Sequence, residues 1–247
     1  AAGSNYSVSK TGSLGPGQFK SYFFRVPAGT KVFVTPLAAR DVFKQVPAAE
    51  ATQVRDRFGI QKEFILFVGT LEPRKNLVGL VEAFAELLRT TELRPQLVLA
   101  GSEGWLNDDL FECIRDSGAA DQIYLPGYVN DDDLAALYST CSVCVYPSIY
   151  EGFGLPPLEA MACGAPVIST NIPVIIETVG SAALLVDPTD VRAWARTIAE
   201  VLSDPGKGAE LSEAGLKRAT EFSWEKTARS TLDVYRSVLE ARRADIE

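Results

Sequence analysis

Apolar residues alternate along the chain between short continuous runs and stretches with helical spacing. The runs are rich in β-branched side chains and predict strands. Because strands that are apolar throughout are buried on both faces, they favour a parallel sheet covered by helices. The predicted strands are Lys31–Thr35, Phe64–Val68, Leu97–Ala100, Gln122–Leu125, Val143–Tyr146, Pro166–Ser169 and Ala183–Val186.

The stretches between the runs predict amphipathic helices. The clearest places Leu77, Leu80, Val81, Phe84, Leu87 and Leu88 on one face, with Asn76 as N-cap. Ser223 is the expected N-cap of the last helix. The others are Asp108–Ser117, Asp132–Ser139, Pro157–Ala162, Val191–Ser203, Lys207–Thr220 and Trp224–Ala241. This alternation predicts an α/β fold with a parallel sheet and helices on both faces.

In open parallel sheets, ligands bind at the carboxyl ends of the strands. The loops after Val68, Ala100, Leu125 and Tyr146 are therefore the places to search for chemistry. Residues 1–30 differ from the rest, since they are rich in Gly and Ser and have weak helical spacing. This beginning is thin for a domain of its own, and the tail of a preceding domain is one interpretation of it.

Composition narrows the possible functions of this 247-residue chain. Lys and Arg number 24 and Asp and Glu 32, a net charge of -8 that disfavours general binding to nucleic acid or anionic membranes. Any phosphate must therefore be held locally. Histidine is absent, which excludes a Ser-His triad and zinc sites that need His within this chain. Proton chemistry is left to carboxylates, Lys, Tyr, Cys or the substrate.

No apolar run approaches the ~18 residues of a membrane span, and the first residues have no apolar signal region. Four cysteines predict buried thiols in a reducing compartment. The C-x-x-C pair Cys141 and Cys144 lies in an apolar run without a second pair, so it does not predict a metal site.

The strongest motif is EGFGLPPLEAMACG, residues 151–164, directly after a predicted strand. Gly152 and Gly154 let the backbone approach a ligand closely, and the following prolines fit a first helical turn. A strand, a glycine loop and a helix N-terminus together form a seat for phosphate. Glu151 in the loop and Glu159 in the first helical turn would each hold one hydroxyl-bearing ring beside the phosphates. Taken singly, either carboxylate could also be a solvated charge or a dipole-favoured helix residue.

A second motif, VGTLEPRKN, ends a strand at Gly69 and places Arg74 and Lys75 before a helix. Cations oppose the dipole at a helix start unless an anion is bound, so this pair is the best counter-charge for a diphosphate. A solvated loop pair is the alternative.

A third motif, LPGYV, ends a strand at Tyr128 and Val129, whose backbone could read a base edge. The acidic residues 131–133 after it are expected to be helix caps rather than metal ligands. Trp105, in another loop at this edge, is expected to serve packing more than stacking.

These motifs resemble the C-terminal half of retaining glycosyltransferases of family 4, which have the two-domain GT-B fold. The resemblance runs from Val32 to Leu239 and rests on the E-x7-E spacing of Glu151 and Glu159. The blocks VGTLEPRKN, LVLAG, LPGYV, LAALY and AALLVDP support it. It implies a Rossmann-like domain at residues 46–247 that binds a nucleotide sugar, with residues 1–45 left from the acceptor-side domain.

The resemblance also implies roles for individual residues. Arg74, Lys75 and Glu151 would form the catalytic centre, with the two cations on the diphosphate and Glu151 on the transferred sugar. Glu159 would bind the ribose. The remaining donor-binding positions implied are Gly69, Thr70, Tyr128, Val129, Gly152, Phe153, Gly154 and Leu155. Thr70 departs from the Arg or Ser that many members carry there, and no metal site is implied.

The expected activity is hexosyl transfer from a nucleotide diphosphate sugar to a hydroxyl of a carbohydrate or lipid-linked acceptor, with retention. The VGTLEPRKN form is similar to mannosyltransferases of bacterial polysaccharide assembly, so GDP-mannose is favoured over UDP- or ADP-sugars. We expect a cytoplasmic enzyme, in contact with the membrane only through the absent domain, and this chain alone not to turn over. A non-catalytic nucleotide-sugar-binding module, or one subunit of a split enzyme, is the alternative. A glycosidase pair at Glu151 and Glu159 is a third, weaker one.

Overall fold

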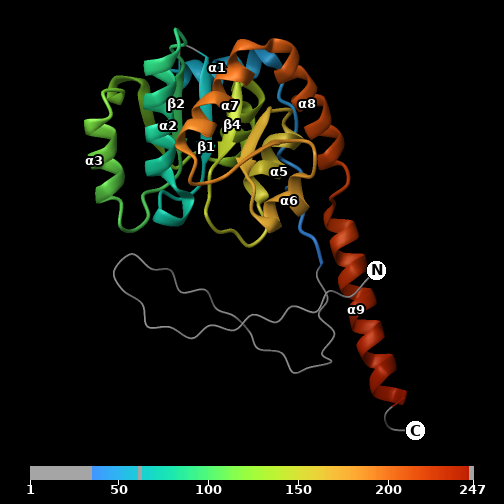
Figure 1. The fold of residues 1–247 in the computed structure, drawn as a ribbon. Coiled ribbons are helices and arrows are strands. Elements are labelled where there is room, and N and C mark those ends of the chain that lie inside the picture. The colour runs from blue at the N-terminus through green and yellow to red at the C-terminus, as the bar shows by residue number, and fades with distance from the viewer. Residues whose placement is uncertain (1–34, 61–62, 245–247) are drawn as a thin grey trace, which may run out of the picture. The chain divides into compact units, whose positions relative to one another are not determined.

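A computed structural model describes residues 35–60 and 63–244, with side chains to residue 240. The predicted strand Lys31–Thr35 and the Gly- and Ser-rich start lie outside the described residues, apart from Thr35, which is not in a strand. Residues 37–227 form one compact unit, and the described residues 228–244, the later part of the last helix, belong to a second. Helices and strands alternate along residues 48–203, after which the described chain continues in helices alone (Figure 1).

Six parallel strands form one sheet in the described part of the chain, in the order β3-β2-β1-β4-β5-β6. They are β1 (Phe64–Val68), β2 (Gln96–Ala100), β3 (Ile123–Gly127), β4 (Val143–Tyr146), β5 (Val167–Thr170) and β6 (Leu184–Val186). The chain first builds outward from β1 to β3 and then returns to place β4 on the other side of β1. The β1–β4 neighbourhood is therefore the switch point at which open α/β sheets bind ligands.

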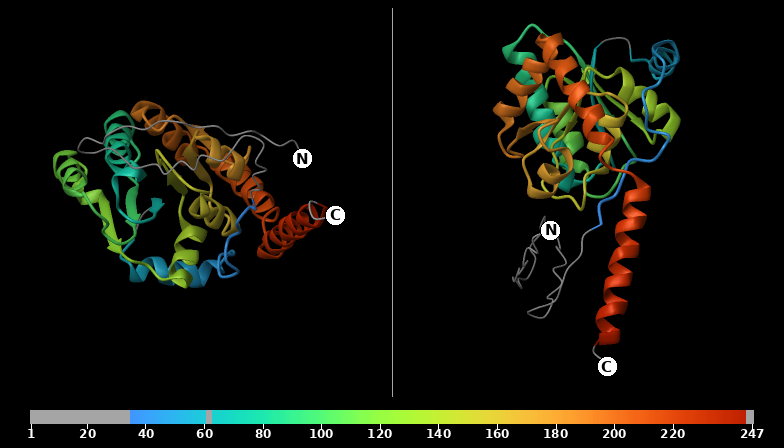
Figure 2. Two further views of the ribbon diagram at one scale, coloured as in Figure 1. Left: turned by 90° about the horizontal axis from the view of Figure 1, so that it is seen from below. Right: turned by 90° about the vertical axis from the view of Figure 1, so that its right-hand side faces the viewer.

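Helices cover both faces of this sheet (left view of Figure 2). On one side, α2 (Leu77–Thr90) packs against α3 (Asp108–Asp116) and α7 (Val191–Ser203). On the other, α4 (Asp131–Thr140) packs against α1 (Ala48–Arg57) and α5 (Leu155–Ala162). The remaining elements are α6 (Pro173–Val179), α8 (Pro205–Ala219), α9 (Trp224–Ala244) and the short 3-10 helices η1 (Pro73–Lys75) and η2 (Ala120–Gln122). The α/β fold with a doubly covered parallel sheet is confirmed.

The apolar pattern explains this packing. All of β1 except Val68 is buried, as is all of β4, and α2 buries the face predicted for it, with Leu88 only half-buried. The prediction that Asn76 caps α2 is wrong, because its side chain makes no cap hydrogen bond. The residue has φ 55°, and its Nδ2 instead donates to the Pro188 carbonyl at 2.6 Å. Ser223 does cap α9, since its Oγ accepts from the Lys226 N–H at 3.2 Å.

Two helices were not predicted. α1 buries only Ala51, so its sequence has little helical apolar spacing, and α6 is seven residues long and follows β5 after two residues. Both are held by tertiary contacts: α1 lies against α4, and α6 against α5. None of the described helices combines the length and the apolar character of a membrane span.

Candidate nucleotide-sugar site

The first wall of the site is the loop that follows β1. Gly69 has φ 151° and donates its N–H to the Ala100 carbonyl at 3.0 Å. A Cβ at Gly101, which has φ 156°, would lie 2.0 Å from the Gly69 carbonyl oxygen. Since no side chain fits there, glycine at 101 lets the loops after β1 and β2 lie directly against each other. The loop then turns through η1, which carries Arg74 and Lys75.

Lys75 is the centre of a buried polar cluster. The residue is only 5% exposed, and its Nζ donates to Glu151 Oε1 at 2.7 Å and to the Tyr146 hydroxyl at 2.8 Å. Burial lowers the pKa of Lys75, although the Glu151 carboxylate partly offsets the shift. Burial alone would raise the pKa of Glu151, but Lys75 outweighs it and the net pKa is lowered. The lowered pKa keeps the Glu151 carboxylate ionised at neutral pH, with Lys75 Nζ as its partner at 2.7 Å.

Arg74 extends this cluster to the solvent. Its Nη1 lies 3.0 Å from Glu151 Oε2, and its Nη2 lies 2.6 Å from Glu72 Oε1. The Arg74 carbonyl also accepts from the Ile149 N–H at 2.9 Å, which ties η1 to the loop after β4. The two cations and two carboxylates balance in charge, so an incoming anion would meet cations already held in place.

The second wall is the loop before α5. Gly154, with φ 96°, is the N-cap of α5, and no side chain caps the helix. A Cβ at Gly154 would lie 2.6 Å from Ile175 Cδ1 of α6. Because Pro156 and Pro157 have no N–H, only the Gly154 and Leu155 amides at this helix start can face an anion before Leu158. The preceding Phe153 is held by its carbonyl, which accepts from the Thr178 hydroxyl at 2.6 Å.

Glu159 lies on α5, in the second turn rather than in the first turn as predicted. It is 8% exposed, and burial raises its pKa to about 7. The Arg40 guanidinium lowers this pKa and the Asp131 carboxylate raises it. Arg40 itself binds Asp131 through two hydrogen bonds of 2.5 and 2.8 Å. Glu159 thus changes charge near neutral pH.

A pocket of about 320 Å³ adjoins these loops. It brings together Gly69, Thr70, Tyr128 and Val129, four of the residues predicted for donor binding. A Cβ at Gly69 would lie 3.7 Å from Lys75 Nζ, so the pocket begins next to the buried lysine. Tyr128 is 74% exposed and Val129 is buried. The other lining residues are Val68, Ala100, Gly101, Ser102, Asp131 and Leu134.

The structure also places three other features of the sequence, namely the acidic residues 131–133, the cysteines and Trp105. The acidic residues 131–133 start α4, where Asn130 is the N-cap, while Asp131 pairs with Arg40 and Asp133 with Arg57. All four cysteines are free thiols, and Cys141 and Cys144 are buried. Trp105 is 53% exposed, and its role in packing rather than stacking stays a prediction.

Sequence reasoning missed three residues of the site. Tyr146 is the last residue of the buried strand β4, and its hydroxyl is a polar group in an apolar run, which could have indicated a site residue. Glu72 lies two residues before Arg74 in the motif, and its opposite charge could have indicated a contact with the cations. Arg40 carried no signal, since it lies in a polar stretch and reaches Asp131 across 91 positions of sequence.

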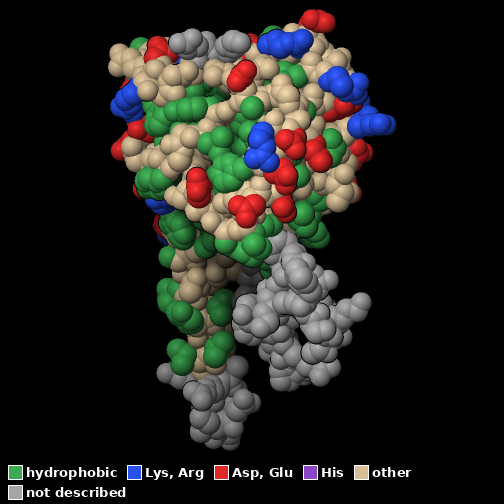
Figure 3. All heavy atoms as spheres, turned by 90° about the vertical axis from the view of Figure 1, so that its left-hand side faces the viewer, with side chains coloured by type: hydrophobic (Ala, Val, Ile, Leu, Met, Phe, Trp, Pro, Cys, Tyr) green, Lys and Arg blue, Asp and Glu red, His purple; other side chains and the backbone are tan. Residues whose placement is uncertain are grey.

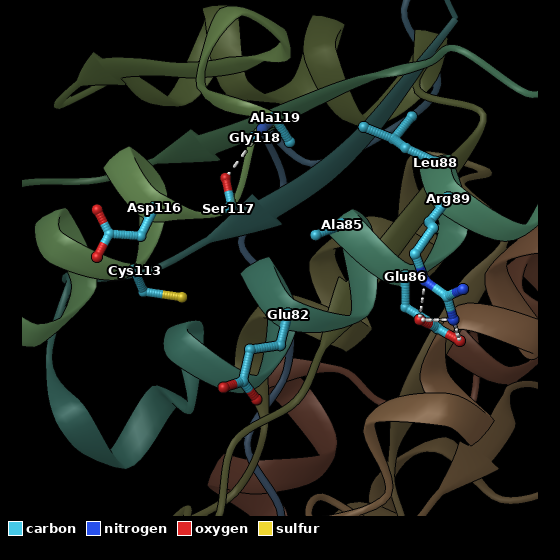
Figure 4. Close-up of a pocket in the computed structure, with 10 residues that line it drawn as sticks. All are labelled: Glu82, Ala85, Glu86, Leu88, Arg89, Cys113, Asp116, Ser117, Gly118 and Ala119. Atoms are coloured by element: carbon cyan, nitrogen blue, oxygen red, sulfur yellow. Dashed lines mark hydrogen bonds and ion pairs between the residues drawn. The ribbon is translucent and has the colours of Figure 1, made fainter.

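The largest pocket described, about 600 Å³, contains none of the predicted site residues (Figure 4). It lies between α2 and α3 and is lined by Glu82, Ala85, Glu86, Leu88, Arg89, Cys113, Asp116, Ser117, Gly118 and Ala119. Its one cation, Arg89, is paired with Glu86 at 2.7 Å. On the face of the molecule in Figure 3, acidic and basic side chains are interspersed. The Arg74–Lys75 cluster therefore remains the better candidate for an anion.

Comparison with known proteins identifies the family. The family model for glycosyl transferases group 1 matches residues 51–218. The O-antigen chain mannosyltransferase B of Escherichia coli is 38% identical over 214 residues, covering 86% of this chain and 56% of the relative. The chain thus spans little more than half of that relative.

Solved structures agree with this. Sucrose-phosphate synthase from Thermosynechococcus elongatus has a TM-score of 0.72 at 30% identity, over 84% of this chain and 52% of that one. The C-terminal domain of a glycosyl transferase group 1 protein from Francisella tularensis has the same fold, with a TM-score of 0.64 at 23% identity, over 73% of this chain and 95% of that one. The chain belongs to the glycosyl transferases group 1 family, whose fold is GT-B.

Proposed function

We propose that this chain is the donor-binding half of a retaining hexosyltransferase of family 4, which moves a hexose from a nucleotide diphosphate sugar to a hydroxyl acceptor. The observation that carries the proposal is the buried Lys75–Glu151–Arg74 cluster at the β1–β4 switch point, next to the uncapped N-terminus of α5. Cations, open amides and carboxylates there match the parts of such a donor, which are a diphosphate between two hydroxylated rings.

The diphosphate would bind between the two walls. Lys75 has three N–H donors and uses two on Glu151 and Tyr146, so the third is available for a phosphate oxygen. Arg74 adds charge from the more exposed side. The backbone amides of residues 152–155 would complete the phosphate seat, with those of Gly154 and Leu155 nearest the helix start.

The rings would lie on either side of the diphosphate. Glu151 would accept hydroxyls of the transferred sugar, and Glu159 would accept the ribose hydroxyls. The pocket beside Tyr128 and Val129 would hold the base, with Gly69 and Thr70 along its phosphate side. Each carboxylate then binds neutral hydroxyls, which explains why two acidic groups flank an anion site.

Proton transfer would not need a histidine from this chain. In a retaining transfer of this kind, the leaving phosphate can accept the acceptor proton while Arg74 and Lys75 stabilise its developing charge. The acceptor would be held by a domain preceding residue 46, of which residues 1–45 are the proposed remnant. The mannosyltransferase name of the relative supports GDP-mannose as the donor.

Calorimetry with GDP-mannose, UDP-glucose and ADP-glucose tests this function. We expect one donor to bind and Arg74→Gln to weaken it about tenfold, since a charge-assisted hydrogen bond contributes about 1.5–3 kcal/mol. Arg115→Gln, which removes an exposed arginine of α3, is the matched control and should bind like the wild type. Failure of all three donors to bind, or an unchanged affinity in Arg74→Gln, would contradict the proposal.

A further inference from the structure

The loop that follows β2, residues 101–106, is hydrogen-bonded to the loop that follows β1 and leads to Arg74 and Lys75. The Leu71 N–H donates to the Ser102 carbonyl at 3.0 Å, and the Gly104 N–H donates to the Leu71 carbonyl at 3.0 Å. A Cβ at Gly104 would lie 2.4 Å from that same carbonyl oxygen. Leu71 is itself buried. The loop after β2 therefore keeps its position relative to Arg74 and Lys75.

This loop presents Trp105 at the rim of the site. The side chain is 53% exposed, yet its indole Nε1 donates to Glu72 Oε2 at 3.3 Å. The next residue, Leu106, has φ 55°, a conformation that costs a non-glycine residue about 1–2 kcal/mol. An aromatic ring held in place by a hydrogen bond and a strained neighbour loses little entropy when a ligand binds it.

Glu72 connects the Trp105 ring to the cluster of Arg74, Lys75 and Glu151. One of its carboxylate oxygens accepts from Trp105, and the other lies 2.6 Å from Arg74 Nη2. A carboxylate at this place weakens diphosphate binding, because it neutralises part of the Arg74 charge. Besides holding Arg74 in place, the Glu72 carboxylate offers hydrogen-bond acceptors to the hydroxyl groups of a neutral ligand.

We propose that Trp105 and Glu72 form a binding subsite for a pyranose ring of a neutral acceptor glycan, next to the donor sugar. This inference rests on the proposed transferase function. The apolar C–H face of the sugar would stack on the indole, which is both apolar and fixed by its N–H. A sugar hydroxyl would donate to a remaining lone pair of the Glu72 carboxylate. The acceptor would thus be bound partly by the donor-binding half of the enzyme.

The test measures saccharide and nucleotide binding separately in the 247-residue chain. An α-linked mannotriose is titrated by ligand-observed NMR with and without saturating GDP, and maltotriose is the second saccharide. We expect Trp105→Ala to weaken mannotriose binding about tenfold or more and Trp105→Phe to retain part of it. GDP affinity should stay within about twofold in both variants, because neither removes a phosphate contact.

Glu72→Gln provides a readout that a merely structural role would not give. It should weaken mannotriose binding while leaving GDP binding equal or tighter, since Arg74 loses a neutralising charge. Trp224→Ala removes a tryptophan of similar exposure, 45%, at the start of α9 and should change neither affinity. Weaker mannotriose binding together with equal or tighter GDP binding in Glu72→Gln would support the subsite.

The subsite is overturned if neither saccharide binds, or if Trp105→Ala binds mannotriose as the wild type does. It is also overturned if Trp224→Ala loses as much affinity as Trp105→Ala, or if Glu72→Gln loses GDP and mannotriose together. Absence of GDP, UDP and ADP binding in the wild type would refute the proposed function instead. In that case the saccharide titrations without nucleotide still decide the subsite.

Discussion

Replacing Lys75 separates its structural role from its proposed role in binding. Lys75→Met keeps the length of the side chain but leaves the buried Glu151 carboxylate without its 2.7 Å partner. Removing one member of a buried ion pair typically costs about 3–5 kcal/mol of the free energy of unfolding. Because Arg74 still lies 3.0 Å from the other Glu151 oxygen, we expect the lower end, about 3 kcal/mol.

The double variant Lys75→Met/Glu151→Gln removes the uncompensated charge. Replacing both members of a buried pair is often close to neutral, so the free energy of unfolding should return to within about 1 kcal/mol of the wild type. GDP binding should not return. Both variants lack the third Lys75 N–H, which is proposed to donate to a phosphate oxygen. Losing this hydrogen bond should cost about 1.5–3 kcal/mol of binding free energy, which is a roughly 10–150-fold weaker affinity for GDP.

Urea denaturation and calorimetry with GDP measure the two effects. GDP lacks the transferred hexose, so the loss of Glu151 as a ligand of that hexose does not affect the comparison. Glu151→Gln alone is the control for the second substitution. Wild-type stability in Lys75→Met would show that the buried pair does not stabilise the fold. Wild-type GDP affinity in the double variant would refute the role of Lys75 in diphosphate binding.

Two further predictions concern Glu159 and Tyr146. Since Glu159 has a pKa of about 7 and must be ionised to accept ribose hydroxyls, GDP-mannose affinity should fall by up to about tenfold per pH unit below 7. Glu159→Gln should bind GDP-mannose more weakly and abolish this pH dependence, and a pH-independent affinity of the wild type would contradict the role of Glu159. The raised pKa also means that ionisation of Glu159 destabilises the fold. The free energy of unfolding should therefore rise as the pH falls from 7 toward 4.5. Tyr146→Phe should cost about 1 kcal/mol in urea denaturation and weaken GDP binding about threefold to tenfold, because Lys75 loses an acceptor at 2.8 Å. Tyr138→Phe, whose buried hydroxyl has no hydrogen-bond partner among the described residues, is the matched control and should be neutral or stabilising; equal losses in both variants would disprove the special role of Tyr146.

The strands could be predicted because their signal is local. The run at Phe64–Val68 is apolar at every position and is β1 with the same bounds, as Val143–Tyr146 is β4. Other strands differ by one or two residues at an end, as for Gln122–Leu125 against β3 at Ile123–Gly127. Helix α1 was missed because it buries only Ala51 and depends on α4 for its position.

The sequence by itself determined the family, the sheet and the two motifs, because glycine loops, prolines and adjacent cations are set within a few residues of each other. Only the tertiary structure decided which charges meet. Lys75 reaches Glu151 across 76 positions because β1 and β4 are neighbours in the sheet, an order that no local pattern encodes. The exposure of Trp105 was decided in the same way, since the hydrogen bonds that hold its loop come from Leu71, in the loop that follows β1. Spacing along the chain reports which residue types are present, whereas long-range packing decides which of them are buried, paired or exposed.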